Sequence, residues 1–139
     1  MENSHDLSSL ISIEEIARLT EALDISWSRD TCYTPQQENW SEANKALGQC
    51  AVTVLVVHDR YGGTFAYDQS NDHYWNIFPD GSHHDFSRKQ FPEGTVFSVT
   101  TTKQREDLLT TPGAIKAKTR ERYLLLRDQV KKSLSSEAL

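Results

Sequence analysis

Apolar residues recur along this chain with two spacings, one typical of helices and one typical of strands. The helical spacing occurs near both ends. Near the start, ISIEEIARLTEAL (11–23) repeats apolar residues at helical spacing, and Ser12 with Glu15 forms a capping box, so a helix is predicted there. Near the other end, residues 110–134 begin with a Thr-Pro sequence that suits a helix N-cap and first position. This final helix should turn one apolar stripe toward the core: Tyr123, Leu126, Val130 and Leu134.

The middle of the chain holds apolar runs that are typical of strands. Short strands are predicted at 64–67 and 95–100, and two more, 71–78 and 82–87, flank a turn. The run CAVTVLVV (50–57) is ambiguous, because its β-branched residues favour a buried strand whereas its length allows a buried helix. Periodicity alone therefore leaves this central element open.

The segment 24–48 has no clean period. Loops of this length are uncommon unless they are functional or disordered. The aromatic residues Trp27, Tyr33 and Trp40 favour an ordered loop, with a short helical turn near 41–47.

The turn between two of the predicted strands determines which side chains meet. Phe78-Pro79-Asp80-Gly81 suits a type I turn followed by a left-handed glycine, which predicts a three-residue hairpin loop. Counting outward from this loop makes His73 and Asp85 diagonal neighbours on one face, roughly 7–8 Å apart between backbones. A two-residue loop would shift the register and put them on opposite faces. The predicted register adds four more residues to that face: Trp75, Ile77, His83 and Ser87.

A cysteine, a histidine and an aspartate are candidates for a nucleophilic site. A carboxylate bonded to one imidazole nitrogen favours the protonated ring, and such a ring can hold a nearby thiol as the thiolate. If Cys50 opens a helix, the free backbone N–H groups there favour the anion and can bind an oxyanion. The order Cys50, His73, Asp85 is that of a papain-like thiol acyl-transfer site.

Four further residues are candidates for supporting roles. Gln49 could donate a hydrogen bond to an oxyanion, or it could simply bond the backbone of its loop. Trp75 could wall the cleft or shield the bond between His73 and Asp85, with a plain core role as the alternative. Trp27 and Ser28 are candidates for the substrate cleft, and packing is the alternative for Trp27.

Four motifs together resemble the YunG-like family of small bacterial and fungal proteins. They read SWSRDTCY (26–33), GQCAVTVLVVHD (48–59), HYWNIFPDG (73–81) and DFSRKQF (85–91), and the resemblance extends from about residue 23 to 130. Small departures from the family pattern, Val54, His58 and Phe86, leave the three candidate residues unchanged. By analogy with papain-like folds, the resemblance implies that 50–60 is a helix, and it implies no particular substrate.

Composition limits the classes of protein that need consideration. At 139 residues the chain is long enough for one domain, 1–139, with 1–11 as a flexible lead-in. Its net charge of −5 without a basic block argues against nucleic-acid or anionic-membrane partners, and no apolar run is long enough to cross a bilayer. The polar N-terminus lacks a signal pattern, so we expect a cytoplasmic protein with Cys32 and Cys50 as free thiols.

A metal site is a less favoured interpretation of the histidines than the nucleophilic site. His73, His83, His84 and Asp85 are close in sequence, but adjacent strand residues point to opposite faces. Only three of these side chains could converge, so we expect no metal and no other cofactor. The alternative from a different class is a non-enzymatic module that binds a small ligand or a protein, with Cys50 as a buried core residue.

The expected fold is α+β: a small papain-like domain whose central helix packs on an antiparallel sheet, flanked by N- and C-terminal helices. The expected function is cysteine-dependent acyl transfer with Cys50 as nucleophile, His73 as base and then acid, and Asp85 as the orienting group. This expected function includes hydrolysis of an amide, ester or thioester, deamidation, and aminolysis or cyclisation. In a chain this small we expect a small-molecule or single-residue substrate, with a homodimer left open.

Overall fold

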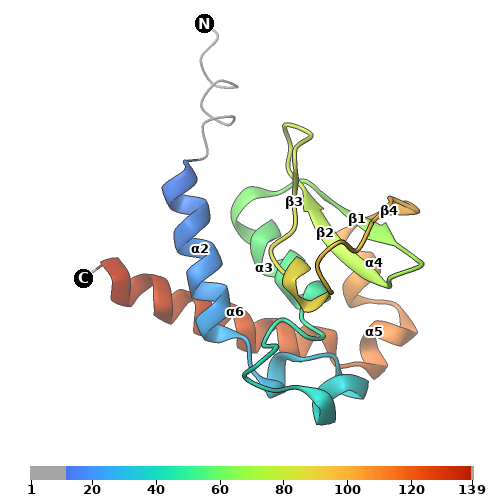
Figure 1. The fold of residues 1–139 in the computed structure, drawn as a ribbon, viewed down its shortest axis with the longest axis horizontal. Helices are drawn as coiled ribbons and strands as arrows, with labels where there is room; N and C mark the ends of the chain where they lie inside the picture. The colour runs from blue at the N-terminus through green and yellow to red at the C-terminus, as the bar shows by residue number, and fades with distance from the viewer. Residues whose placement is uncertain (1–11, 139) are drawn as a thin grey trace, which may run out of the picture.

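A computed structural model describes residues 12–138, with side chains as far as residue 135. The lead-in expected at 1–11 lies outside the described residues. The fold combines one four-stranded sheet with three long helices that lie to one side of it (Figure 1): α2 (Ile13–Ser26), α3 (Cys50–Tyr61) and α6 (Thr119–Ala138). Helix α6 packs against both α2 and α3, and α3 packs in turn on strand β2 (His73–Ile77). The expected α+β class is therefore correct.

Helix α2 begins where the sequence predicts. The side chain of Ser12 accepts a hydrogen bond from the backbone N–H of Glu15 at 2.9 Å, which satisfies one of the unpaired donors of the first turn. The helix extends three residues beyond the predicted end, to Ser26, because its last turns are buried in the core.

Residues 50–61 are helical, as the family resemblance implied. All six residues from Val52 to Val57 are buried in helix α3. A helix with this much apolar surface is stable only when other elements cover it, and here β2 and α6 do so. The indole N–H of Trp27 donates to Thr53 at 2.9 Å, and Asn76 of β2 donates to the carbonyl of Val54 at 3.1 Å, so buried polar groups are also paired along this helix.

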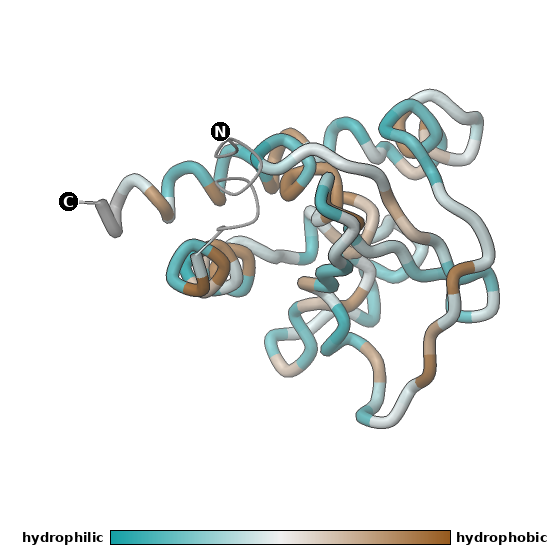
Figure 2. The backbone as a smooth tube through the Cα atoms, turned by 90° about the horizontal axis from the view of Figure 1, so that it is seen from above, coloured by the Kyte–Doolittle hydropathy of each residue, from teal (hydrophilic) through white to brown (hydrophobic). Residues whose placement is uncertain are grey.

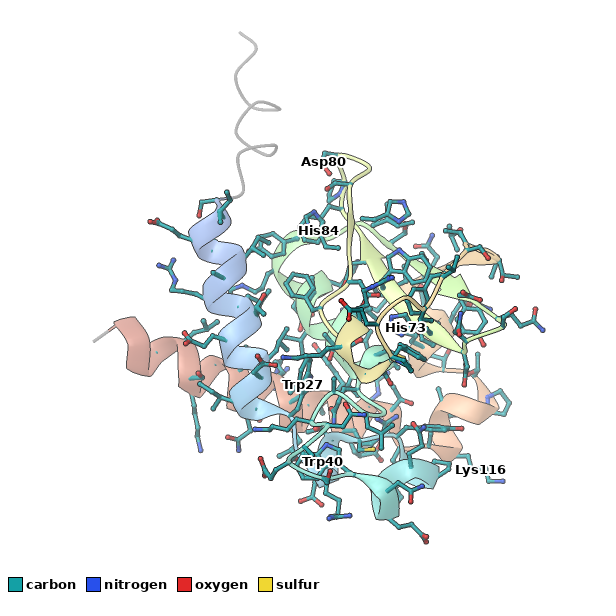
Figure 3. The ribbon with its side chains drawn as sticks, viewed as in Figure 1. Trp27, Trp40, His73, Asp80, His84 and Lys116 are labelled. Atoms are coloured by element: carbon teal, nitrogen blue, oxygen red, sulfur yellow. The ribbon has the colours of Figure 1, made fainter. Side chains whose placement is uncertain are left out.

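The sheet is antiparallel with strand order β3-β2-β1-β4, where β1 is Thr64–Asp68, β3 is His83–His84 and β4 is Thr101–Lys103. Strands β2 and β3 pair Ile77 with His83, and the N–H of Phe78 donates to the carbonyl of Ser82 at 2.8 Å. Gly81 has a φ of +88°, as the left-handed end of the turn requires. The predicted three-residue loop and its register are confirmed, and Figure 3 shows Asp80 at the hairpin tip.

The strand predicted at 95–100 is wrong. These residues form no strand, and β4 lies just after them, paired with β1. The segment instead crosses a sheet face, where the ring of Phe97 lies 5.0 Å from that of His73 and 5.9 Å from that of Trp75. The carboxylate of Asp68 accepts the N–H of Ser98 at 3.0 Å. Alternation here reflects a loop that partly buries one aromatic side chain, Phe97.

The single helix predicted over 110–134 is also wrong. Two short helices, α4 (Arg105–Leu109) and α5 (Pro112–Lys116), precede α6, and Lys118 separates α5 from α6 with a φ of +56°. The predicted N-cap of α5 is present, since Thr111 accepts the N–H of Ala114 at 3.2 Å. The predicted stripe on α6 is confirmed, with three members buried and Leu134 partly buried against the same core.

Beyond the end of α2, the long segment before α3 is ordered but contains no further α-helix. It forms two 3₁₀ turns, Arg29–Thr31 and Thr34–Asn39, and residues 41–47 form hydrogen-bonded turns where a helical turn was predicted.

Figure 2 shows apolar and polar segments alternating along α6, which matches its burial on one side only. No helix in the described part of the chain combines the length and apolar content that crossing a membrane requires.

Candidate active site

His73 is the centre of the candidate site. It is the first residue of β2, its side chain is 0% exposed, and its Nε2 atom lies 2.7 Å from Oδ2 of Asp85. The two residues are diagonal neighbours across the hairpin, so the confirmed register is what brings them together. Asp85 is held in turn by the backbone N–H of Ser87, which donates to its Oδ1 at 3.3 Å.

Aromatic rings enclose the imidazole of His73. Phe91 lies edge-on at 4.8 Å between ring centroids, Phe97 lies at 5.0 Å, and Trp75 lies at 5.8 Å. Figure 3 shows His73 in the interior between β2 and the segments that cover it. These rings exclude water, which strengthens the bond between His73 and Asp85.

The second ring nitrogen of His73 is free. Nδ1 is buried and has no hydrogen-bond partner among the described groups. Burial by itself lowers the pKa of His73. The hydrogen bond to Asp85 and the neighbouring thiol of Cys50 raise the pKa by more than burial lowers it, so that it is about 9. Since Asp85 occupies Nε2, Nδ1 is the atom left for the thiol. A ring with this pKa carries its second proton at neutral pH.

Cys50 is the first residue of α3, and its side chain is partly exposed. The loop before it is tightly packed: Gly48 has a φ of +71°, and a Cβ there would lie 2.6 Å from Sγ of Cys32. The backbone of Gly48 accepts the N–H of Tyr33 at 2.8 Å and donates to Oε1 of Gln90 at 3.2 Å. Backbone N–H groups in the first turn of a helix have no intrahelical acceptor, so they are available beside this thiol.

Gln49 lies fully buried directly before Cys50. Its Oε1 accepts from the hydroxyl of Thr31 at 2.8 Å, and its Nε2 donates to the carbonyl of Ser28 at 3.0 Å. One amide N–H of Gln49 therefore remains for another acceptor. The same two bonds tie the first 3₁₀ turn to the start of α3.

A cavity of about 440 Å³ opens beside Cys50. Its wall comes from the 24–48 segment, the start of α3, the end of the β1–β2 turn, and helices α4 to α6. Polar members of the wall carry both signs of charge: Asp72, Asp107 and Arg122. The volume suits a small molecule or one residue of a chain, not an extended peptide.

The other predicted residues lie near this centre but outside the cavity wall. Trp27 is buried in the core, and the carbonyl of Ser28 accepts a hydrogen bond from Gln49. Neither residue lines the cavity. Trp75 shares the face of His73, and its indole N–H donates to Nδ1 of His83 at 2.9 Å.

Several residues of the site had no predicted role. Gln90 links the hairpin to the loop before Cys50, Phe91 covers His73, and Arg122 lines the cavity. Gln90 and Phe91 stand within the DFSRKQF motif, so the motif itself was the available signal. Arg122 gave no signal, because a helical arginine is most often exposed.

The histidines and the aspartate that were considered as metal ligands do not come together at one point. Within residues 12–135, no group of three or more His, Cys, Asp or Glu side chains is placed to hold a metal ion. Cys32 is buried, and burial raises the pKa of its thiol to about 11, so it is a neutral thiol at physiological pH.

Comparison with known proteins identifies the family and no fold relative. No solved structure matches this chain significantly. A curated relative, described as uncharacterized protein YunG of Bacillus subtilis (strain 168), is 28% identical over 113 residues, which cover 80% of this chain and 87% of the relative. The family model described as YunG protein matches residues 15–135, a span that contains Cys50, His73 and Asp85. The chain therefore belongs to the YunG family.

Proposed function

We propose that this protein is a cysteine-dependent acyl-transfer enzyme with Cys50, His73 and Asp85 as a papain-like triad. One observation carries the proposal: a fully buried histidine is bonded to a carboxylate through one ring nitrogen, its other nitrogen has no partner among the described groups, and the carboxylate and a neighbouring thiol both raise its pKa. A histidine that only packs in a core needs neither feature. The thiol stands at the N-terminus of a buried helix and faces a cavity, which is where a nucleophile can be both activated and reached.

The proposed reaction divides into two steps. The thiolate of Cys50 attacks the carbonyl carbon of an amide, ester or thioester, and the oxyanion that forms accepts hydrogen bonds from the backbone N–H of Cys50 and the spare amide N–H of Gln49. The imidazolium of His73 gives its proton to the leaving group as the bond to the carbonyl carbon breaks. Water or an amine then loses a proton to His73, attacks the thioester, and releases the thiol.

Asp85 serves the reaction without touching the substrate. Its bond to Nε2 leaves Nδ1 as the ring nitrogen that can serve the thiol, and it would stabilise the imidazolium, as the third member of such triads does. The cavity volume favours small amides or esters over general proteolysis. Hydrolysis, deamidation and transfer to an amine all use the same residues.

Alkylation by iodoacetamide, followed by mass spectrometry at each cysteine, tests this proposal. In the wild type at pH 6, Cys50 should label at least about tenfold faster than glutathione, because an imidazolium stabilises its thiolate. His73→Ala should remove that advantage, whereas His84→Ala, on the facing strand, should keep it. Cys32 is an internal control that stays unlabelled until the protein unfolds.

Slow labelling of Cys50 that is indifferent to His73→Ala would overturn the proposal. The protein would then be a binding module whose cysteine is part of the core.

A further inference from the structure

Arg122 is a buried cation that the proposed reaction does not use. It lies in the first turn of α6 with only 4% of its surface exposed. Three of its N–H groups are taken: Nε donates to the carbonyl of Ala117 at 2.9 Å, Nη1 to the carbonyl of Thr31 at 3.0 Å, and Nη2 to the hydroxyl of Thr119 at 3.3 Å. A guanidinium has five donors, so two N–H groups remain, one on each terminal nitrogen.

The positive charge of Arg122 is not balanced by a carboxylate partner within residues 12–135. Among the residues whose side chains the structure describes, no carboxylate forms an ion pair with Arg122. Burial lowers its pKa, and the neighbouring Cys32 is a neutral thiol. Burying a cation without a paired anion is costly, so a ligand that supplies an anion at this position would offset part of that cost.

Arg122 and Cys50 face the same cavity. Both line it, and the two groups are close enough to interact electrostatically. Tyr33, also in the wall, places its ring 5.9 Å from the guanidinium carbon. The three neutral bonds to Ala117, Thr31 and Thr119 hold the guanidinium in a fixed orientation, so a ligand would not have to order it.

The negatively charged side chains in the wall of this cavity are exposed, unlike Arg122. Asp72 and Asp107 lie at the surface, and each already accepts a hydrogen bond, from Tyr67 at 2.7 Å and from the N–H of Gln104 at 2.8 Å. The cavity thus has a buried positive charge and negative charges at its mouth. A ligand with one carboxylate fits this arrangement better than one with several, because a second carboxylate would face the acidic residues.

We propose that Arg122 binds a carboxylate of the substrate, so that the Cys50 site acts on small amides or esters carrying one carboxylate a few atoms from the reacting carbonyl. This inference rests on the proposed function, and it names the substrate class of that site. Arg122 would fix the substrate by a pair of N–H donors while the thiolate reaches the carbonyl carbon.

The test uses two alkylating probes that differ only in charge. N-iodoacetylglycine carries a carboxylate, and N-iodoacetylglycinamide carries a neutral amide of the same size; each forms a thioether with Cys50 and releases iodide. The measured quantity is the ratio of the acid rate to the amide rate at Cys50, divided by the same ratio for glutathione. We expect this normalised ratio to be on the order of ten in the wild type, since a buried charge-assisted pair is worth that much.

Matched variants identify the group responsible. Arg122→Gln should bring the ratio close to one, and Arg122→Lys should retain part of the preference. Arg120→Gln removes the same charge from an exposed position of the same helix and should leave the ratio unchanged. A wild-type ratio near one overturns the inference whether or not Arg122→Gln folds, and so does a high ratio that persists in a folded Arg122→Gln.

The result is distinguishable from failure of the proposed function. If Cys50 reacts with neither probe, the triad proposal fails, and N-acetylglycine and N-acetylglycinamide are then titrated into the Cys50→Ala protein by NMR. Binding of the acid alone, lost in the double variant with Arg122→Gln, supports a carboxylate site without catalysis. Equal binding of both compounds, or of neither, overturns it.

Discussion

At the scale of single residues, His73 combines two conditions that normally oppose each other. A fully buried imidazole should lose its proton, because burial penalises the charged form. Here the 2.7 Å bond to Asp85 and the thiol of Cys50 more than offset that penalty, and the pKa rises to about 9. The proton on His73 is therefore bound more tightly in the folded protein than in the unfolded chain, where an ordinary histidine pKa is near 6.5.

This difference predicts how stability depends on pH. A group whose folded pKa is raised stabilises the fold fully below its unfolded pKa and loses that contribution as pH rises through the folded pKa. In the Cys50→Ala protein, where His73 titrates without the thiol, the free energy of unfolding should fall as the pH rises from about 6 to about 9, by at most roughly 2–3 kcal/mol at about 1.4 kcal/mol per pKa unit. Urea unfolding at the two pH values measures it.

Two aspartates on the same hairpin provide the comparison. Asp85→Asn should shrink the fall in stability, because it removes the main group that holds the proton. Asp80→Asn, at the exposed hairpin tip, should leave the fall unchanged. An NMR titration of His73 with a midpoint near 6.5 would contradict the prediction.

At the scale of elements, the position of α3 depends on the loop that enters it. Gly48 takes a φ of +71°, and its Cα faces Sγ of Cys32 and the backbone N of Tyr33, so close that a Cβ would lie 2.6 Å and 2.9 Å from them. The Oε1 of Gln90 also accepts a hydrogen bond from the backbone N–H of Gly48 at 3.2 Å. The loop before the thiol is therefore clamped between the 24–48 segment and the end of the hairpin.

Gly48→Ala should consequently destabilise the protein and displace Cys50. We expect a loss of roughly 2–4 kcal/mol, combining the strain of a positive φ with a contact to backbone that cannot yield. Gly94→Ala is the matched control, since Gly94 has a φ of +88° but open space around its Cα. Urea unfolding and the labelling rate of Cys50 measure the two effects, and equal losses in both variants would show that the close contact is unimportant.

At the scale of the whole molecule, α6 joins the parts that surround the site. It packs on α2 and on α3, its buried stripe completes the core, and its first turn supplies Arg122 to the cavity. The carbonyl of Thr31, far away in sequence, accepts from Arg122 at 3.0 Å. The C-terminal helix is thus part of the fold and of the candidate site at once.

Neighbouring leucines on α6 test this dependence. Leu126 is 0% exposed within the core and Leu125 is 38% exposed. Leu126→Ala should lower the free energy of unfolding by roughly 2–5 kcal/mol, and Leu125→Ala by less than about 1 kcal/mol, since only the first leaves a cavity. Urea unfolding with unchanged m-values checks the difference, and similar losses would mean that α6 is not docked as described.

Local chemistry made the hairpin and the helix starts predictable. The Phe-Pro-Asp-Gly turn implied a register, and the register alone placed His73 beside Asp85. Ser12 and Thr111 marked helix starts through caps that form within three residues. Prediction failed where local sequence carried no signal: the loop at 95–100 packs Phe97 against the distant His73, and no residue type marks the break at Lys118.

By itself, then, the sequence determined the elements whose geometry is local: the caps, the turn, the strand register, and through them the pairing of His73 with Asp85. Only the tertiary structure decided that β2 and α6 cover the helix at 50–61, that Phe91 and Phe97 enclose His73, and that Arg122 meets Cys50 in one cavity. These contacts join residues dozens of positions apart. Their energies come from burial, which no spacing along the chain reports.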